Sequence, residues 1–388
     1  MRILFLTFYF EPDLCAGSFR NTPLFRELLQ QAGESGWIHV ITTQPNRYNS
    51  FHVEGQAEVI EGNYRINRIR IPEHKSGFID QAKSFRVYYK EALRLTRKER
   101  YDLVYASSSR LFTAFLGRRI AGRQGIPLYL DIRDIFVDTI KDVFRGRKMI
   151  QIPAGICFKW IERYTFSKAK HINLVSEGFK AYFSKYDKPV YSYFTNGIDD
   201  IFLNIPKPTK RDSKVKVITY AGNIGSGQGL EKVVPMAAQK LGNPYFFRII
   251  GDGGIKKLLK DKVEELGVHN VELLDPVSRD KLIEYYNDSD FLFLHLNDLE
   301  AFKKVLPSKL FEYAAFGKPI IAGVGGYASQ FIRENLDNYI LFAPTDVESM
   351  VTQLLKFEGC DKDQGNFVRK FARKNIMEEM ARSILECR

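Results

Sequence analysis

The chain has 388 residues, of which 45% are apolar and 27% are charged, as in a soluble globular protein. This length exceeds one comfortable hydrophobic core, so we expect two domains. No stretch approaches the roughly 18 apolar residues of a membrane-spanning helix, and the apolar run over 3–10 is too short for a signal peptide. Four cysteines lie far apart without a C-x-x-C pair, which disfavours a disulfide framework or zinc site and fits a reducing cytoplasm.

The net charge of +12 is unevenly distributed along the sequence. Residues 1–200 hold 31 Lys and Arg against 21 Asp and Glu, and the remainder is nearly neutral. A basic first half indicates an anionic partner, such as a membrane surface, a pyrophosphate lipid or nucleic acid. Because no nucleic-acid-binding motif is present, we favour the first two and expect no nucleic-acid partner.

Apolar strands alternate with helical stretches along the whole chain. This alternation predicts parallel, doubly wound sheets, and therefore an α/β protein with two Rossmann-like domains. We place the first domain at 1–203, a polar linker at 204–214, the second domain at 215–365 and a final helical stretch at 366–388. The strands are expected at about 2–8, 37–42, 66–71, 103–106, 127–131, 171–175 and 190–194, then 215–221, 246–250, 271–274, 291–296, 319–322 and 339–342.

Ligands of such sheets bind at the carboxyl ends of the strands, so the loops there are the candidate sites. After the first strand, Gly17 and Ser18 would allow close backbone approach, and Arg20 offers a cation to an anionic acceptor. The alternative is a tight turn with a solvated Arg20. The fifth strand ends in Asp131 and Asp134, acids placed for proton transfer or for steering a hydroxyl group.

Asp134 is the first candidate of these two acids and Asp131 the second. Either could instead cap the next helix or pair with Arg133. Further on, residues 141–170 mix basic side chains with apolar and aromatic ones. Such a stretch can lie in the interface of an anionic bilayer. The alternative is a packed helix pair with a solvated basic face.

The second domain opens with a strand followed by a glycine-rich loop, 222–229. Its glycines would let the backbone lie close to a phosphate or a sugar. The spacing is not G-x-G-x-x-G and no acid follows the next strand at the dinucleotide position, so we expect no nicotinamide cofactor. A second close-approach loop begins at Gly251, and the backbone around Val277 is suited to holding a flat base.

A short helix is predicted within 307–319, because a proline lies in its first turn and a glycine at its end. Its first N–H groups and its dipole suit a phosphate, and Lys309 adds a full positive charge there. Glu312, one turn further on, is placed to accept hydrogen bonds from a ribose diol. The alternative is an ordinary amphipathic helix with Leu310 and Phe311 in the core.

These pieces, in this order, resemble the retaining nucleotide-sugar glycosyltransferases of family 4, which have the GT-B architecture of two domains facing a central cleft. The resemblance rests on the Gly17-Ser18 loop, 176–179, 196–199, 222–223, 251–253 and 307–319. It covers nearly the whole chain and is strongest for bacterial enzymes of O-antigen, capsule or exopolysaccharide synthesis. It implies an acceptor in the first domain, a nucleotide sugar in the second, no metal, and a final helix that returns to the first domain.

The loops and the resemblance together give a set of candidate site residues. The catalytic candidates are Asp134 and Lys309, and the acceptor candidates are Gly17, Ser18, Arg20 and Asp131. The donor candidates are Gly222, Asn223, Gly225, Gln228, Gly251, Val277, Lys304, Pro307, Ser308, Lys309, Leu310 and Glu312.

The sequence also departs from the family pattern at the expected donor site. The family has two glutamates eight positions apart; Glu312 matches the second, but Lys304 stands at the first. Asn223 and Gln228 stand where the family has a basic pair that contacts the diphosphate. We expect Lys309, helped by Lys303 or Lys304, to supply the missing charge.

We therefore predict a retaining glycosyltransferase that moves a sugar from a nucleoside diphosphate, with UDP favoured. Its acceptor would be a growing glycan or a polyprenyl-diphosphate-linked glycan at the inner face of the cytoplasmic membrane. One alternative is a GT-B sugar-nucleotide epimerase, which requires two acids near the sugar carbon. Another is a non-catalytic partner in a polysaccharide assembly complex, a reading that Lys304 favours.

Overall fold

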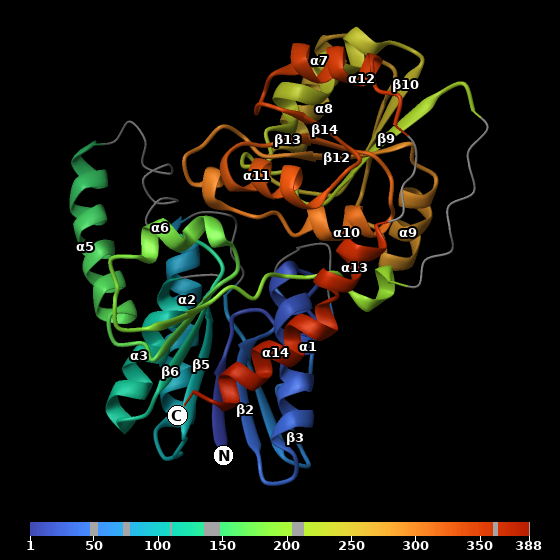
Figure 1. The fold of residues 1–388 in the computed structure, drawn as a ribbon. Coiled ribbons are helices and arrows are strands. Elements are labelled where there is room, and N and C mark those ends of the chain that lie inside the picture. The colour runs from blue at the N-terminus through green and yellow to red at the C-terminus, as the bar shows by residue number, and fades with distance from the viewer. Residues whose placement is uncertain are drawn as a thin grey trace. The chain divides into compact units, whose positions relative to one another are not determined.

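A computed structural model describes residues 1–46, 53–72, 78–108, 111–135, 148–203, 213–359 and 364–387. The chain forms two compact units (Figure 1). Unit 1 comprises Met1–Asn196 and Lys374–Arg388, and unit 2 comprises Gly197–Arg373. The chain therefore passes from unit 1 to unit 2 and back again. The assignment of an acceptor to one unit and a donor to the other remains a proposal.

Unit 1 contains an eight-stranded sheet in the order β3-β4-β2-β1-β5-β6-β7-β8. Its strands are β1 (Arg2–Leu6), β2 (Trp37–Thr43), β3 (Glu58–Glu61), β4 (Tyr64–Ile69), β5 (Leu103–Ser108), β6 (Leu128–Ile132), β7 (His171–Leu174) and β8 (Val190–Ser192). Its helices are α1 (Ala16–Ala32), α2 (Phe78–Thr96), α3 (Leu111–Gln124), α5 (Lys148–Phe166), α6 (Lys180–Phe183) and nearly all of α14 (Arg373–Leu385).

Unit 2 contains a six-stranded parallel sheet in the order β11-β10-β9-β12-β13-β14. Its strands are β9 (Lys216–Ala221), β10 (Tyr245–Ile250), β11 (Val271–Leu274), β12 (Phe291–His295), β13 (Ile320–Gly323) and β14 (Tyr339–Phe342). Its helices are α7 (Leu230–Leu241), α8 (Lys256–Glu265), α9 (Arg279–Asn287), α10 (Lys309–Ala315), α11 (Gly326–Asn335), α12 (Val347–Leu355) and α13 (Gly365–Phe371).

The two sheets confirm the predicted α/β class, because the central strands are buried along nearly their whole length. Every residue of β5 and of β12 is buried, as expected for parallel strands covered by helices on both faces. One element was not predicted. The short strand β3 pairs antiparallel with β4 through a turn at Gly62, whose φ is 50°. Its four residues, two apolar ones between two glutamates, form no apolar run long enough to signal a strand.

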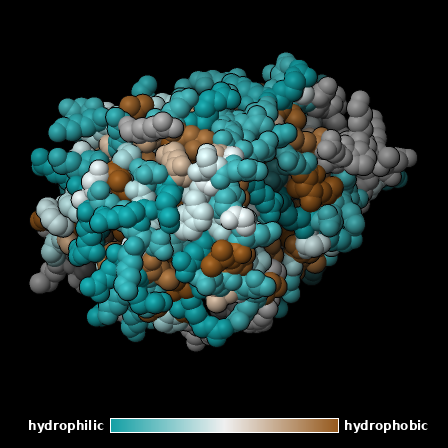
Figure 2. Space-filling model, turned by 90° about the horizontal axis from the view of Figure 1, so that it is seen from below, coloured by the Kyte–Doolittle hydropathy of each residue, from teal (hydrophilic) through white to brown (hydrophobic). Residues whose placement is uncertain are grey.

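The surface carries its apolar side chains in small groups. On the face shown in Figure 2, hydrophobic residues stand in separate patches among hydrophilic ones, which is normal for a protein surface in water. None of the helices within the described ranges combines the length and apolarity that crossing a bilayer requires.

Candidate functional site

The loops at the carboxyl ends of β9 and β10 press directly on each other. Gly222 follows β9 with a φ of 143°, and Gly251 follows β10 with a φ of 146°. A Cβ atom added to Gly251 would lie 1.8 Å from the carbonyl oxygen of Gly222. No larger residue fits there, so the packing of one loop on the other explains this glycine. At this edge of the sheet, the backbone of both loops is therefore uncovered by side chains at Gly222 and Gly251.

Asn223 and Gln228 fix the shape of the 222–229 loop. Asn223 Nδ2 donates to Gln228 Oε1 at 2.9 Å, and the Gly225 N–H donates to the same oxygen at 3.2 Å. His295 bonds the Gln228 carbonyl through Nδ1 at 2.5 Å and accepts from the Thr345 N–H through Nε2 at 3.0 Å. Burial lowers the pKa of His295 to about 4, so the ring is neutral at pH 7. These side chains hold the loop in shape and bring no positive charge to it.

Lys309 is the first residue of α10, and its ammonium group lies against this loop. A Cβ atom at Gly222 would lie only 1.9 Å from Lys309 Nζ. The Nζ atom is 5.6 Å from the ring centroid of Tyr220. No described residue forms a hydrogen bond or an ion pair with it. Burial lowers the pKa of Lys309, and Glu312 opposes the change. An unneutralised positive charge thus stands beside the glycine backbone.

Glu312 is half-buried one turn further along α10, and no described residue donates a hydrogen bond to its carboxylate. Burial raises its pKa, while the charges of Lys309, Arg279 and Arg373 act to lower it. The two arginines are already paired, since both donate to Asp199, Arg373 at 2.7 Å. Glu312 therefore keeps a carboxylate available for a hydroxyl donor.

The start of α10 corrects one prediction. Leu310 is fully buried in the core, and its N–H donates to the Pro307 carbonyl oxygen at 3.2 Å. Neither group is available to a donor, as the amphipathic-helix alternative expected. α10 has only seven residues, so its dipole is small and Lys309 must carry most of the positive potential. Ser308, Lys304 and Val277 are half-buried, and their contact with a donor remains a proposal.

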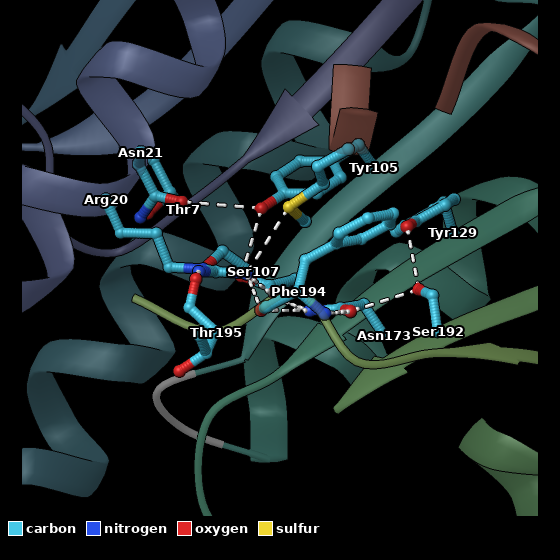
Figure 3. A network of polar contacts seen from close by, with 12 residues as sticks. Thr7, Arg20, Asn21, Tyr105, Ser107, Tyr129, Asn173, Ser192, Phe194 and Thr195 are labelled. Carbon is cyan, nitrogen blue, oxygen red and sulfur yellow. Dashed lines mark hydrogen bonds and ion pairs between the residues drawn. The ribbon is translucent and has the colours of Figure 1, made fainter. Parts of the chain in front are cut away.

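In unit 1, the predicted acceptor residues Arg20 and Asp131 form a buried ion pair. Figure 3 shows Arg20 within the surrounding polar network, which includes Tyr105 and Asn173. Arg20 Nε and Nη2 donate to the two Asp131 oxygens at 2.8 and 2.9 Å, and the side chains are 1% and 0% exposed. Asp131 also accepts from Asn173 Nδ2 at 2.8 Å and from the Tyr105 hydroxyl at 3.2 Å. Burial acts to raise the pKa of Asp131. The Arg20 charge and the hydrogen bonds from Arg20 and Asn173 outweigh burial and hold this pKa below its usual value.

This geometry overturns the expected roles of both residues. The remaining Arg20 donors bond the carbonyl oxygens of Phe194 and Thr195 at 2.8 and 2.7 Å, and Nη2 lies 3.3 Å from Met380 Sδ. Every charged group in the cluster is satisfied from within unit 1. The pair therefore holds α1, β6 and α14 together and cannot bind an acceptor.

Gly17 and Ser18 lie in the first turn of α1 and both are buried. A Cβ atom at Gly17 would lie 2.9 Å from both Arg133 Nη1 and Tyr9 Cβ. Tyr9 Cβ is fixed close to the backbone and limits the space at this position, whereas Arg133 Nη1 is the end of a flexible side chain that a larger residue would displace. Whether an acceptor lies against this turn remains a proposal.

Asp134 follows β6 and its side chain is exposed. The surrounding protein raises its pKa to about 6, and Arg133 opposes the rise. Because the carboxyl group faces solvent, water screens part of this effect and a smaller rise is expected. Of the two acids, Asp134 is the one that remains accessible for proton transfer.

The basic and aromatic stretch predicted at 141–170 lies partly outside the described residues, which resume at 148. Its described part is α5, where Ile156 and Trp160 are 65% and 63% exposed. Tyr164 continues the same stripe, and its ring stacks on Trp160 with centroids 5.9 Å apart. Lys159 and Arg163 are also exposed. This surface is both apolar and basic.

The family-model match to known proteins covers mainly unit 2. Residues 202–374 match the family model of the glycosyl transferases group 1. A candidate colanic acid biosynthesis glycosyl transferase of Escherichia coli (strain K12), WcaI, is 36% identical over 102 residues, which cover 26% of this chain and 25% of that protein. The match thus spans a quarter of the relative's length.

Solved structures extend the similarity to the whole fold. Anabaena Alr3699/HepE, solved with UDP and glucose, superimposes with a TM-score of 0.66 at 14% identity over 99% of both chains. WaaG, a glycosyltransferase involved in lipopolysaccharide biosynthesis, gives a TM-score of 0.68 at 15% identity over 99% of this chain and 100% of its own. The group 1 match and these neighbours give the chain the GT-B fold.

Proposed function

We propose that this chain is a retaining glycosyltransferase that takes a sugar from a UDP-sugar. The observation that carries the proposal is the Lys309 ammonium beside Gly222, with the Glu312 carboxylate one turn away, since neither has a hydrogen-bond or ion-pair partner among the described residues. A half-buried cation and a half-buried acid without partners cost free energy unless a ligand pairs with them. A nucleoside diphosphate has complementary groups, since its phosphates are anionic and its ribose carries a hydroxyl pair.

The chemistry follows from where charge develops. As the glycosidic bond to phosphate breaks, negative charge grows on the departing oxygen, and Lys309 and the loop N–H groups would stabilise it without rearranging. The acceptor hydroxyl would attack on the face that the phosphate leaves, which retains the anomeric configuration without a protein nucleophile. Asp134 is the proposed proton acceptor, because an exposed carboxyl group with a raised pKa suits that role near neutral pH.

Donor and acceptor are proposed from the relatives together with the charges. The HepE structure holds UDP and glucose, and the WcaI and WaaG names refer to colanic acid and lipopolysaccharide synthesis. We extend this to a UDP-sugar donor and to a glycan acceptor that is growing or linked to a polyprenyl diphosphate. The exposed apolar and basic surface of α5 supports a peripheral position on the inner, anionic face of the cytoplasmic membrane.

The test is turnover with a panel of UDP-, GDP- and dTDP-sugars and a lipid-linked glycan acceptor, followed by NMR of the product. A new glycosidic bond with the donor's anomeric configuration is expected. EDTA should leave the rate unchanged, because Lys309 would neutralise the diphosphate charge in place of a metal ion. Conversion of the sugar without transfer would favour the epimerase, and absence of any turnover would favour the non-catalytic partner. An inverted product or loss of rate in EDTA would contradict the proposed mechanism.

A further inference from the structure

Arg133 carries a positive charge that has no ion-pair partner among the described residues of unit 1. It follows β6, and its backbone N–H donates to the Ser108 carbonyl oxygen at 3.2 Å. The Nε atom of its guanidinium is buried without a hydrogen-bond partner. No described residue forms an ion pair with the side chain. A guanidinium group stays protonated at neutral pH even when burial disfavours its charge.

The acids around Arg133 are engaged elsewhere or face solvent. Asp131 is bound through both oxygens by Arg20. Asp13 is buried and accepts from the Asn46 N–H at 3.2 Å. Asp134, the residue directly after Arg133, is exposed. Arg20 itself adds a like charge near Arg133. Asp131 therefore attracts the Arg133 guanidinium at longer range, but no described carboxylate forms an ion pair with it.

The guanidinium group also lies at the positive end of a long helix. Its Nη1 atom would be 2.9 Å from a Cβ atom on Gly17, in the first turn of α1. α1 has 17 residues, no acidic residue in its first turn and no side-chain hydrogen bond at its N-cap, Cys15. The helix dipole and the guanidinium therefore add at one place, and both favour an oxyanion. A buried donor left unpaired is also a recognised sign of an absent ligand.

We propose that Arg133 and the first turn of α1 bind a phosphate oxyanion of the acceptor. This rests on the proposed function, and it names the group by which the acceptor is held: the diphosphate that joins a glycan to its lipid carrier. The sequence pointed to Arg20 for this purpose, but Arg20 forms an ion pair with Asp131, whereas Arg133 has no such partner in the described part of the chain. The donor nucleotide has the same phosphate chemistry, so the test must separate the two sources.

The probe is inorganic pyrophosphate, titrated calorimetrically into the full chain with and without saturating UDP. We expect pyrophosphate to bind in both conditions, and Arg133→Met to weaken the binding by at least about tenfold, the effect of losing a charge-assisted hydrogen bond. Arg133→Lys should recover part of the affinity. Arg86→Met, which removes an equal charge from the exposed surface of α2, should leave it unchanged.

Gly17→Ala provides a second variant that leaves Arg133 in place. Its new Cβ atom should displace the guanidinium and also weaken pyrophosphate binding, and thermal melts will show that both variants fold. Equal pyrophosphate affinity in wild type and Arg133→Met would overturn the inference, as would binding that saturating UDP abolishes. If UDP itself fails to bind while Arg133-dependent pyrophosphate binding persists, the proposed donor site fails and this inference stands.

Discussion

At the level of single residues, Lys309 and Glu312 reduce the stability of the folded protein because both are charged groups in a partly buried position. Burial lowers the pKa of the lysine and raises that of the glutamate. Both shifts mean that the folded state disfavours the charged form. Lys309 and Glu312 attract each other, but neither forms a hydrogen bond or an ion pair in the described part of the chain. At neutral pH each residue therefore reduces stability, and a ligand of matching charge would recover that free energy.

Glu312→Gln should weaken UDP binding and stabilise the free protein. The loss of one charge-assisted hydrogen bond to ribose is worth roughly 1.5–3 kcal/mol, or about 10- to 100-fold in affinity. Glu312 has a folded pKa above its unfolded value, so its favourable contribution is lost as pH rises through the folded pKa. Glutamine mimics the protonated acid, and the melting temperature at pH 7 should rise. Unchanged UDP affinity would remove Glu312 from the donor site.

Lys309→Met should lower kcat more than it raises KM for the donor. The methionine keeps an apolar stem and deletes only a charge that would act chiefly on the breaking bond. Lys240→Met is the matched control, because Lys240 pairs with Glu348 on the surface of unit 2. An unchanged kcat in Lys309→Met would transfer the diphosphate role to Lys303, Lys304 or the backbone.

At the level of elements, the Arg20–Asp131 pair joins parts of unit 1 that are distant in sequence. Arg20 lies on α1 and Asp131 on β6, and Arg20 also contacts Phe194, Thr195 and Met380. Because the contacts are buried and bidentate, removing one partner would leave a charge without solvent or counter-ion. The cluster fixes the end of β6 from which Arg133 and Asp134 emerge.

Arg20→Met should destabilise the fold by about 3–5 kcal/mol, the cost of breaking a buried ion pair on one side. Wild-type Asp131 has a depressed pKa, so its contribution is present above the ordinary carboxyl value near 4 and is lost as pH falls through the folded pKa. In Arg20→Met the unpaired acid should instead favour protonation, and stability should increase as pH falls from 7 to 5. Urea unfolding across this range measures both trends, with Arg26→Met as control.

An Arg20→Met protein of wild-type stability with weakened acceptor binding would reverse this assignment. The outcome matters because sequence reasoning placed Arg20 at the acceptor. Arg20 and Asp131 are 111 residues apart, and nothing local indicates their pairing. Lys309 and Glu312 lie one turn apart on one helix, so their spacing alone predicted that they share a site.

Some strands could be predicted from the sequence and one could not. Apolar runs such as those of β5 and β12 predicted buried parallel strands because a strand covered on both faces must be apolar throughout. β3 is short and half charged, and only its pairing with β4 reveals it. Arg133 was read as a possible partner of Asp131 or Asp134, and its unpaired state follows only once Asp131 is known to be taken.

At the level of the whole molecule, the excess positive charge lies in the half of the sequence that forms unit 1. The exposed stripe on α5 adds apolar side chains to that charge, the combination that favours an anionic bilayer interface. Such binding depends on long-range attraction, which salt screens over about 8–10 Å at moderate ionic strength.

Binding to anionic liposomes should therefore fall with added salt, and Trp160→Ala should weaken it. The chain has two tryptophans, Trp37 and Trp160, so the fluorescence of a Trp37→Phe variant reports on Trp160 alone and should shift to the blue on binding. Equal partitioning onto neutral and anionic vesicles, or no change in this emission, would favour α5 as a packed helix with a solvated face.

The double passage of the chain between the units has a consequence for synthesis on the ribosome. Unit 2 is continuous in sequence, from Gly197 to Arg373, whereas unit 1 includes Lys374–Arg388. Domains generally fold as units while the chain is being made, the earlier before the later. Here the residues of unit 1 that are made first cannot complete their contacts at once, because Arg20 contacts Met380, which is made only after the whole of unit 2. The nascent protein would thus complete its second unit first and its first unit last.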